Sequence, residues 1–283
     1  MCAGENNSSY GTASDEDGRV SVRSALQACI YHMFRKLAFN LKNLCSQVLP
    51  PTRWTRKTAR SRSMLGQLQD WILLQEAKSI YVARQQRALA STVEYIEKNM
   101  PLVESVKSRP ELLTKAFGRA DTSGDRLICE FGVFKGVSIN HIAKLTGKIV
   151  FGFDSFEGLP EKWGDGWKKG EFAVARLPKV RSNVTLIKGW FNESLPPFLK
   201  QNRGSVGFLH VDCDLYSSTK TIFELLEPRL GRGTVIVFDE YFNYPQWEGG
   251  EFKAFQEFLS KTRFSCEFIG YHRNGEQVAV ILN

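Results

Sequence analysis

Short apolar runs alternate with stretches of helical spacing through the second half of the chain. We interpret these runs as five strands followed by two C-terminal strands. They cover residues 126–130, 148–154, 183–188, 206–212 and 234–239, and then 266–271 and 277–282. Continuous apolar runs are typical of strands that are buried on both faces of a sheet. The pattern therefore predicts a sheet inside a domain rather than on its surface.

The segments between these strands repeat their apolar positions at the spacing of a helix. They cover residues 137–145, 195–200, 219–226 and 251–259, and a short helix is predicted before them over 112–117. Strands that alternate with helices predict a doubly wound α/β sheet. Asn274-Gly275, between the last two strands, is typical of a hairpin tip. We therefore predict a Rossmann-like α/β sheet, mostly parallel, with an antiparallel C-terminal hairpin.

The first 62 residues have a different pattern. Residues 1–20 are polar and predict disorder, residues 24–49 have the spacing of an amphipathic helix, and residues 53–62 form a basic linker. Residues 24–62 could contact a membrane surface, but packing on its own domain or on a second subunit is favoured for such a helix. The predicted organisation is an N-terminal extension (1–62), then one domain (63–283) with a helical prologue (63–120) and a core (121–283).

The net charge of +8 is concentrated near the N-terminus. Residues 18–69 carry ten basic and no acidic residues, whereas residues 70–283 carry 28 basic and 26 acidic ones. A main domain this close to neutral argues against a nucleic-acid groove across it.

The cysteines and the hydropathy bear on the cellular setting. The six cysteines include no C-x-x-C pair, and Cys129 and Cys213 fall in apolar strands, where buried thiols are common. No apolar run approaches the roughly 20 residues that span a bilayer. Both observations favour a reduced, cytoplasmic setting.

A glycine-containing turn follows the first predicted strand. The segment L-I-C-E-F-G-V-F-K-G (127–136) leaves the strand at Glu130 and passes Gly132 and Gly136 before the next helix. Glycine allows a backbone to approach a ligand closely, and the amides at a helix start can point at an anionic group. Such a turn also needs glycine for structural reasons, so the motif alone is weak evidence for a ligand site.

Four of the five core strands end in an acidic residue: Glu130, Asp154, Asp212 and Asp239. Ligands of open α/β sheets bind beyond the carboxyl ends of the strands. Asp154 can accept both hydroxyls of a ribose there, although an exposed loop acid is the structural alternative. Ser155 and Phe156 follow Asp154, and Phe156 offers an apolar face to an adenine or a methionine chain.

Asp212 and the pair Asp239-Glu240 follow two strands that we expect to be neighbours, about 4.8 Å apart. Three carboxylates this close repel one another unless a cation lies between them, and oxygen ligands favour Mg²⁺ or another hard divalent cation. Asp214 could join this cluster or act as a base. The alternative is that Glu240 turns away and Asp239 caps a loop. His210 is expected to be a satisfied core histidine.

Four ordered blocks resemble the macrocin O-methyltransferase family: E-F-G-V-F-K-G-V-S, F-G-F-D-S-F-E-G-L-P, V-D-C-D-L-Y-S-S-T and F-D-E-Y-F. The resemblance covers about residues 64–283. It implies a class I methyltransferase sheet, S-adenosylmethionine as methyl donor, and Mg²⁺-assisted methylation of sugar hydroxyls. It also implies cofactor contacts at Glu130, Gly132, Gly136 and Asp154, and metal ligation at Asp212, Asp239 and Glu240. Family members commonly have two aspartates where this chain has Asp239-Glu240.

The predicted function is therefore an S-adenosylmethionine-dependent, Mg²⁺-assisted O-methyltransferase. We expect a hydroxyl-bearing sugar, glycan or other small molecule as acceptor, Asp212 or Asp214 as proton acceptor, and self-association into a homo-oligomer as in family relatives. Two alternatives stay open. A nicotinamide- or nucleotide-binding Rossmann enzyme would have G-x-G-x-x-G, whereas this chain has one residue more between its two glycines and no third. A non-catalytic scaffold would instead depend on the basic residues 18–69.

Overall fold

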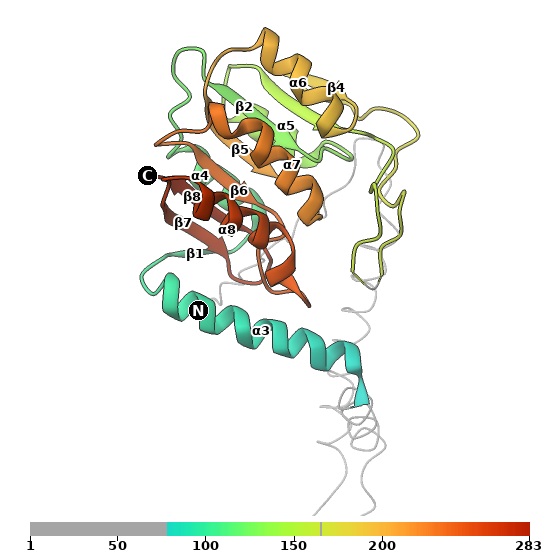
Figure 1. The fold of residues 1–283 in the computed structure, drawn as a ribbon, viewed down its shortest axis with the longest axis vertical. Coiled ribbons are helices and arrows are strands. Elements are labelled where there is room, and N and C mark those ends of the chain that lie inside the picture. Colours follow the sequence, from blue (N-terminus) through green and yellow to red (C-terminus); the bar gives the residue numbers. More distant parts are fainter. Residues whose placement is uncertain (1–77, 165) are drawn as a thin grey trace, which may run out of the picture. The chain divides into compact units, whose positions relative to one another are not determined.

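The computed structural model describes residues 78–164 and 166–283 (Figure 1). The disordered segment, amphipathic helix and basic linker predicted for residues 1–62 lie outside the described residues. The predicted domain boundary after residue 62 therefore stays a prediction.

The described strands form one eight-stranded sheet in the order β1-β7-β8-β6-β5-β2-β3-β4. They are β1 (Ser105–Val106), β2 (Leu127–Phe131), β3 (Val150–Asp154), β4 (Val184–Lys188), β5 (Val206–Val211), β6 (Val235–Phe238), β7 (Cys266–His272) and β8 (Val278–Leu282). Neighbours in this sheet are parallel except at β6–β8 and β7–β8. The structure confirms the mostly parallel sheet with an antiparallel hairpin, and adds β1, which was not among the predicted strands.

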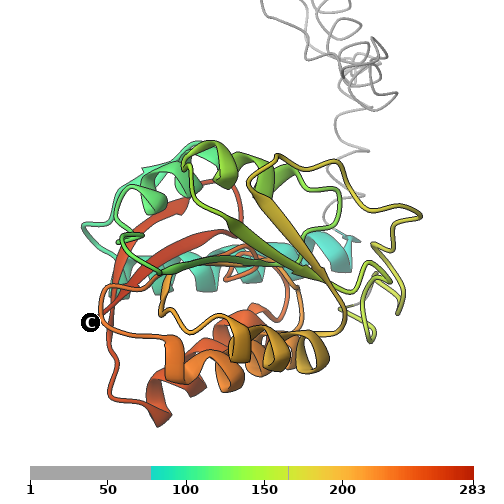
Figure 2. The ribbon, with the colours of Figure 1, turned by 90° about the horizontal axis from the view of Figure 1, so that it is seen from above.

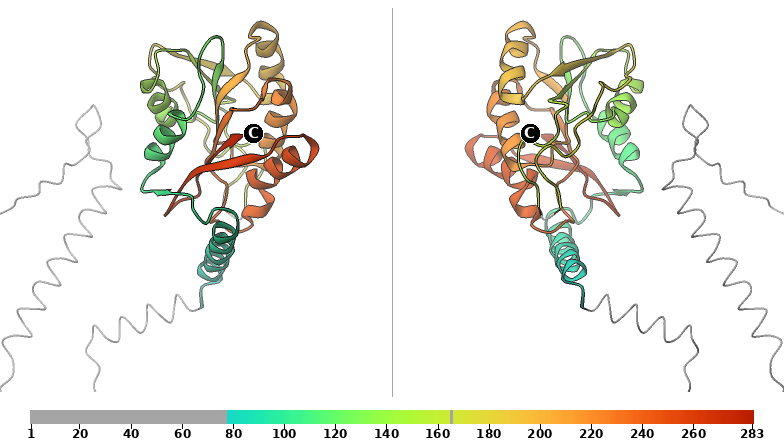
Figure 3. Two further views of the ribbon diagram at one scale, coloured as in Figure 1. Left: turned by 90° about the vertical axis from the view of Figure 1, so that its left-hand side faces the viewer. Right: turned by 90° about the vertical axis from the view of Figure 1, so that its right-hand side faces the viewer.

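Helices cover both faces of the sheet (Figures 2 and 3). On one face lie α4 (Arg109–Phe117) and α5 (Val137–Lys144); on the other lie α6 (Phe191–Gln201), α7 (Tyr216–Leu226) and α8 (Glu251–Lys261). The long helix α3 (Ile80–Asn99) packs against the loop after β6, where the hydroxyls of Tyr95 and Tyr241 are 3.1 Å apart. The remaining elements are the 3₁₀ helices η1 (Glu227–Arg229) and η2 (Trp247–Gly249).

Successive residues of the central strands point to opposite faces, so each face has its own apolar core. Ile128 packs in a buried cluster with Ile139 of α5, whereas Cys129 lies in the cluster that contains Phe223 of α7. Cys129 and Cys213 are both buried, as predicted. No helix within the described ranges combines the length and the hydropathy that crossing a membrane requires.

Candidate active site

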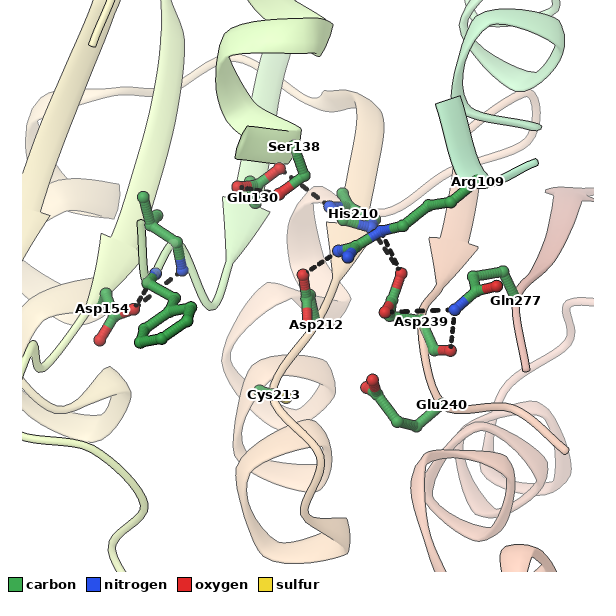
Figure 4. A network of polar contacts seen from close by, with 12 residues as sticks. Arg109, Glu130, Ser138, Asp154, His210, Asp212, Cys213, Asp239, Glu240 and Gln277 are labelled. Atoms are coloured by element: carbon green, nitrogen blue, oxygen red, sulfur yellow. Dashed lines mark hydrogen bonds and ion pairs between the residues drawn. The ribbon is translucent and has the colours of Figure 1, made fainter. Parts of the chain in front are cut away.

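The acidic ends of β5 and β6 meet at one edge of the sheet. The two strands are parallel neighbours, as predicted, and Val211 pairs with Phe238. The next residues are Asp212 and Asp239, and one carboxylate oxygen of each lies with a ring nitrogen of His210 in a group whose atoms are within 4.8 Å of one another. We call Asp212, Asp214, Asp239 and Glu240 the acidic rim, of which Figure 4 labels Asp212, Asp239 and Glu240.

Arg109 brings a positive charge to the acidic rim. It is the first residue of α4, and its side chain extends over the ends of β5 and β6 (Figure 4). One terminal guanidinium nitrogen forms an ion pair with Oδ2 of Asp212, and Nε lies 2.6 Å from Oδ1 of Asp239. The sequence analysis missed Arg109, because it precedes Asp212 by 103 residues and belongs to no strand end.

His210 connects the acidic rim to Glu130. Its Nδ1 lies 2.9 Å from Oε2 of Glu130, and its Nε2 lies 3.7 Å from Oδ1 of Asp239. The hydroxyl of Ser138 donates a hydrogen bond to the other oxygen of Glu130 at 3.1 Å. Burial lowers the pKa of His210, but its contacts with Asp239 and Glu130 outweigh burial and raise the pKa to about 9. His210 is buried, as expected of a core histidine, and its Nδ1 has a partner in Glu130, but its Nε2 has no hydrogen-bond partner within the described part of the chain, so the expected satisfied histidine is only partly found.

Burial and mutual repulsion separate the pKa values of the rim carboxyls. Burial and the charge of Asp239 raise the pKa of Asp212 to about 8 and that of Asp214 to about 7. Burial acts on Asp239 too, but His210 and Arg109 outweigh it and keep the pKa of Asp239 below its usual value. A carboxyl whose pKa is near neutrality is suited to accept a proton, so both Asp212 and Asp214 fit the predicted role.

Glu251, the first residue of α8, fixes the two loops that carry the rim. Its side chain is fully buried. Oε1 accepts a hydrogen bond from the backbone N–H of Cys213 at 3.2 Å, and Oε2 accepts one from the N–H of Glu240 at 3.3 Å. Burial raises the pKa of Glu251 well above its usual value, although the bond from Cys213 opposes the shift. The sequence analysis did not find this role, because both partners are backbone groups.

Gly132 allows the turn after β2 to pass close to the chain after β5. Its φ is +89°, and a Cβ at this position would overlap the backbone carbonyl oxygen of Asp212. The sequence suggested two reasons for this glycine, the approach of a ligand and a structural need of the turn. The structure shows a backbone contact that requires it, and Gly132 also lines the cavity described below. Gly136, with φ of +77°, is the N-cap of α5, where glycine adopts the left-handed conformation without a steric cost.

Asp154 holds the same turn. Its Oδ2 accepts hydrogen bonds from the N–H groups of Val133 and Phe134, both at 2.8 Å, and its Oδ1 accepts one from the N–H of Phe156 at 2.6 Å. Each carboxylate oxygen has further lone pairs, so the turn can still present Asp154 to a ribose.

A cavity of about 820 Å³ lies between the glycine turn and the acidic rim. All predicted site residues line it except Glu130, Gly136 and Phe156. Glu130 is 0% exposed and Phe156 is 5% exposed, with its ring in the core beside α5. The cofactor contacts predicted for these three residues therefore have no support from this cavity.

Two aromatic residues that the sequence analysis did not select also line the cavity. Trp190 and Phe191 lie at the N-terminal end of α6, directly after β4 and its following glycine. The rule that ligands bind beyond the carboxyl ends of strands could have indicated them. A second aromatic group connects the glycine turn to the loop after β6 through ring contacts between Phe134 and Phe172, Phe172 and Trp167, Trp167 and Trp163, and Trp163 and Tyr244.

The acidic rim is suited to a further cation. Arg109 and His210 are two positive charges beside four rim carboxyls and Glu130. Oε2 of Glu240 is buried and has no hydrogen-bond partner within the described part of the chain. Burial raises the pKa of Glu240 well above its usual value. Carboxylate oxygens are the ligands that Mg²⁺ prefers, so the donor set of Asp212, Asp239 and Glu240 fits a divalent cation.

Most of this site falls within a range that matches a family profile. Residues 129–241 match the profile of a family described as a methyltransferase domain. The matched range starts in β2, ends after β6, and includes the glycine turn and the whole acidic rim. This part of the chain is similar to a methyltransferase domain.

Two curated relatives match parts of this chain. An 8-demethyl-8-(2,3-dimethoxy-alpha-L-rhamnosyl)-tetracenomycin-C 4'-O-methyltransferase from Streptomyces olivaceus is 31% identical over an alignment of 140 residues that covers 40% of this chain and 52% of the relative. A demethyldecarbamoylnovobiocin O-methyltransferase from Streptomyces niveus is 25% identical over 173 residues, 52% of this chain and 63% of the relative. The chain thus spans less than two thirds of the length of either relative.

The fold of this chain also matches a solved structure. The calicheamicin methyltransferase CalS11 superposes with a TM-score of 0.51 and 22% identity, over 82% of this chain and 99% of CalS11. At this identity the likeness concerns the fold. It agrees with the mostly parallel α/β Rossmann-like sheet and its antiparallel C-terminal strands.

Proposed function

We propose that this protein transfers a methyl group from S-adenosylmethionine to a hydroxyl oxygen of a sugar or another small natural-product acceptor. The observation that carries the proposal is the cavity of about 820 Å³ that joins the glycine turn and Asp154 to the acidic rim, in a part of the chain that is similar to a methyltransferase domain. Both curated relatives are O-methyltransferases by name, and one name includes a rhamnosyl group. The resemblance to macrocin O-methyltransferases points to the same chemistry.

S-adenosylmethionine, when bound, supplies a reactive methyl group on a positively charged sulfur. The protein then has to exclude water, align the acceptor and remove its hydroxyl proton. Trp190 and Phe191 give the cavity an apolar wall, and the acidic rim favours a cationic ligand on the other side. Asp212 or Asp214 accepts the proton, since both line the cavity and both have pKa values raised to about 8 and about 7 respectively.

The same proposal includes a divalent cation. Asp212, Asp239 and Glu240 would hold Mg²⁺, which lowers the pKa of a hydroxyl that it coordinates. The unpaired Oε2 of Glu240 supports this assignment. A cytoplasmic setting and a homo-oligomeric state stay predictions of the sequence.

Methyl transfer can be tested directly with labelled S-adenosylmethionine, Mg²⁺ and a panel of glycosides that carry vicinal diols. We expect a singly methylated product by mass spectrometry, and its loss in D212N. E248Q is the matched control, because Glu248 is exposed and does not line the cavity. Transfer by D212N at the rate of the unmodified protein would contradict the assigned role of the rim.

A further inference from the structure

We infer that Arg109 and a divalent cation exclude each other at the acidic rim: Arg109 holds Asp212 and Asp239 while no ion is bound, and has to leave them when one binds. The inference rests on the proposed function, because it takes Asp212, Asp239 and Glu240 to be the metal site. Arg109 is then a positioning residue that sets the metal affinity of this chain.

First, most carboxylate oxygens of Asp212 and Asp239 already have a partner in this structure. Arg109 pairs with Oδ2 of Asp212 and with Oδ1 of Asp239. The side-chain amide of Gln277 donates to Oδ2 of Asp239 at 3.3 Å. Three of the four carboxylate oxygens of these two aspartates therefore already have a partner. A cation bound by both carboxylates therefore competes with the guanidinium, which holds one oxygen of each.

The second argument is charge. An arginine side chain stays protonated at every physiological pH, and the guanidinium of Arg109 lies beside the carboxylates of both Asp212 and Asp239. A fixed positive charge between two carboxylates repels a second cation at the same place. The guanidinium and the ion are therefore alternatives, and both cannot occupy the space between Asp212 and Asp239.

The third argument is that Arg109 compensates only part of the rim. Its ion pairs reach Asp212 and Asp239 but not Glu240. Among residues 78–164 and 166–283, both Oε2 of Glu240 and Oδ1 of Asp239 are buried without a hydrogen-bond partner, but only Oδ1 of Asp239 is within ion-pair distance of Arg109. A divalent ion brings more charge than arginine and could use Glu240 as well. The rim thus has a carboxylate oxygen, Oε2 of Glu240, that can bind the ion but forms no ion pair with Arg109.

The fourth argument is the place of Arg109 in its helix. A positive charge in the first turn of a helix is unfavourable, because the helix dipole is positive there. The start of α4 is already specified by Ser108, whose hydroxyl accepts a hydrogen bond from the N–H of Glu111 at 3.3 Å, and by Pro110. Helix formation does not explain an arginine at this position, whereas contact with the rim does. Arg109 also lines the cavity and is 34% exposed, so the side chain has space to leave the rim.

The test is a titration of the full-length protein with Mn²⁺ in the absence of S-adenosylmethionine. Binding is monitored by electron paramagnetic resonance. We expect R109Q to bind Mn²⁺ at least about tenfold more tightly than the unmodified chain, because the competing charge is gone. K115Q is the control on the same helix, since Lys115 pairs with Glu104 at 2.6 Å and makes no contact with the rim; it should bind as the unmodified chain does. Adding E240Q to R109Q should remove much of the gain.

Circular dichroism shows whether R109Q is folded; if it is not, R109M replaces it, because methionine keeps an unbranched side chain without the charge and should also tighten binding. Equal Mn²⁺ affinity in the folded variant and the unmodified chain overturns the inference, and so does the absence of Mn²⁺ binding in both. A calorimetric titration of the same samples with S-adenosylmethionine separates the two proposals. A chain that binds S-adenosylmethionine but shows no effect of Arg109 keeps the proposed function and loses only this inference.

Discussion

The buried carboxylate of Glu251 accepts a hydrogen bond from the backbone N–H of Cys213, 38 residues earlier in the chain. Its second oxygen accepts one from the N–H of Glu240. One side chain at the start of α8 therefore ties the end of β5 to the end of β6. The spacing between Asp212 and Glu240, on which any shared ligand depends, follows from this contact.

Replacing Glu251 by glutamine should destabilise the protein. The amide offers one acceptor oxygen where two backbone N–H groups need one each, so one buried donor loses its partner. Such a loss costs about 1–3 kcal/mol of the free energy of unfolding. Urea denaturation measures it, with E248Q on the exposed side of η2 as the control. A free energy of unfolding for E251Q equal to that of E248Q would show that Glu251 does not hold the two loops.

The contact between Gly132 and Asp212 predicts a larger effect. In G132A the new Cβ would overlap the carbonyl oxygen of Asp212, and neither backbone can move without disturbing the sheet. We expect a loss of about 3 kcal/mol or more, or failure to fold. G124A is the matched control, because Gly124 also has a positive φ, +59°, but has nothing within 4 Å of an added Cβ. It should lose only the roughly 1–2 kcal/mol of left-handed strain. Similar losses in both variants would refute the steric explanation.

The sheet was predictable because its central strands are buried on both faces. Each of the predicted strands is present, most of them with their ends moved by one or two residues, such as the first, which extends past Glu130 to Phe131. The pair Ser105–Val106 of β1 was not predictable, since two residues at the sheet edge have no periodicity. The predicted helix over 195–200 begins earlier, at Phe191, and this earlier turn puts Trp190 and Phe191 at the cavity.

The candidate site was predictable only where it follows the strand ends. Asp212 and Asp239 lie together because β5 and β6 are neighbours. No such rule applies to Arg109 and Glu251, since they reach the rim from the starts of two helices. Arg109 precedes Asp212 by 103 residues, and Glu251 follows Glu240 by 11 residues in another element. The sequence showed a surplus of carboxylates and predicted a cation; the structure has Arg109 and His210 as two of the compensating charges.

The three backbone hydrogen bonds to Asp154 predict a role in shaping the cofactor cradle. In D154N one carboxylate oxygen becomes an NH2 group, which cannot accept a hydrogen bond. At least one of the three backbone N–H groups then loses its acceptor, so the turn should loosen. We expect the affinity for S-adenosylmethionine to fall about tenfold or more, which corresponds to about 1.4 kcal/mol or more. E157Q is the control, since Glu157 is 62% exposed and is 3.9 Å from Lys188. Unchanged affinity in D154N would exclude a cofactor role for this carboxylate.

Removal of divalent ions should lower methyl transfer if the rim binds one. EDTA is expected to reduce the rate, and added Mg²⁺ to restore it. E240Q should require more Mg²⁺ for half-maximal restoration, because the amide keeps the size of the side chain but removes its charge. E276Q controls for a nearby half-buried carboxyl, whose pKa burial and the charges of Asp239 and Asp214 raise to about 7. A rate that is insensitive to EDTA in the unmodified chain would indicate transfer without a metal.

The most direct test of the account is a calorimetric titration of the full-length protein with S-adenosylmethionine, and in parallel with NAD. The account predicts binding of one S-adenosylmethionine per chain, weaker binding by D154N, and no heat of binding with NAD. Binding of NAD in the absence of any binding of S-adenosylmethionine would contradict it, and the cavity between the glycine turn and the acidic rim would then belong to a different class of enzyme.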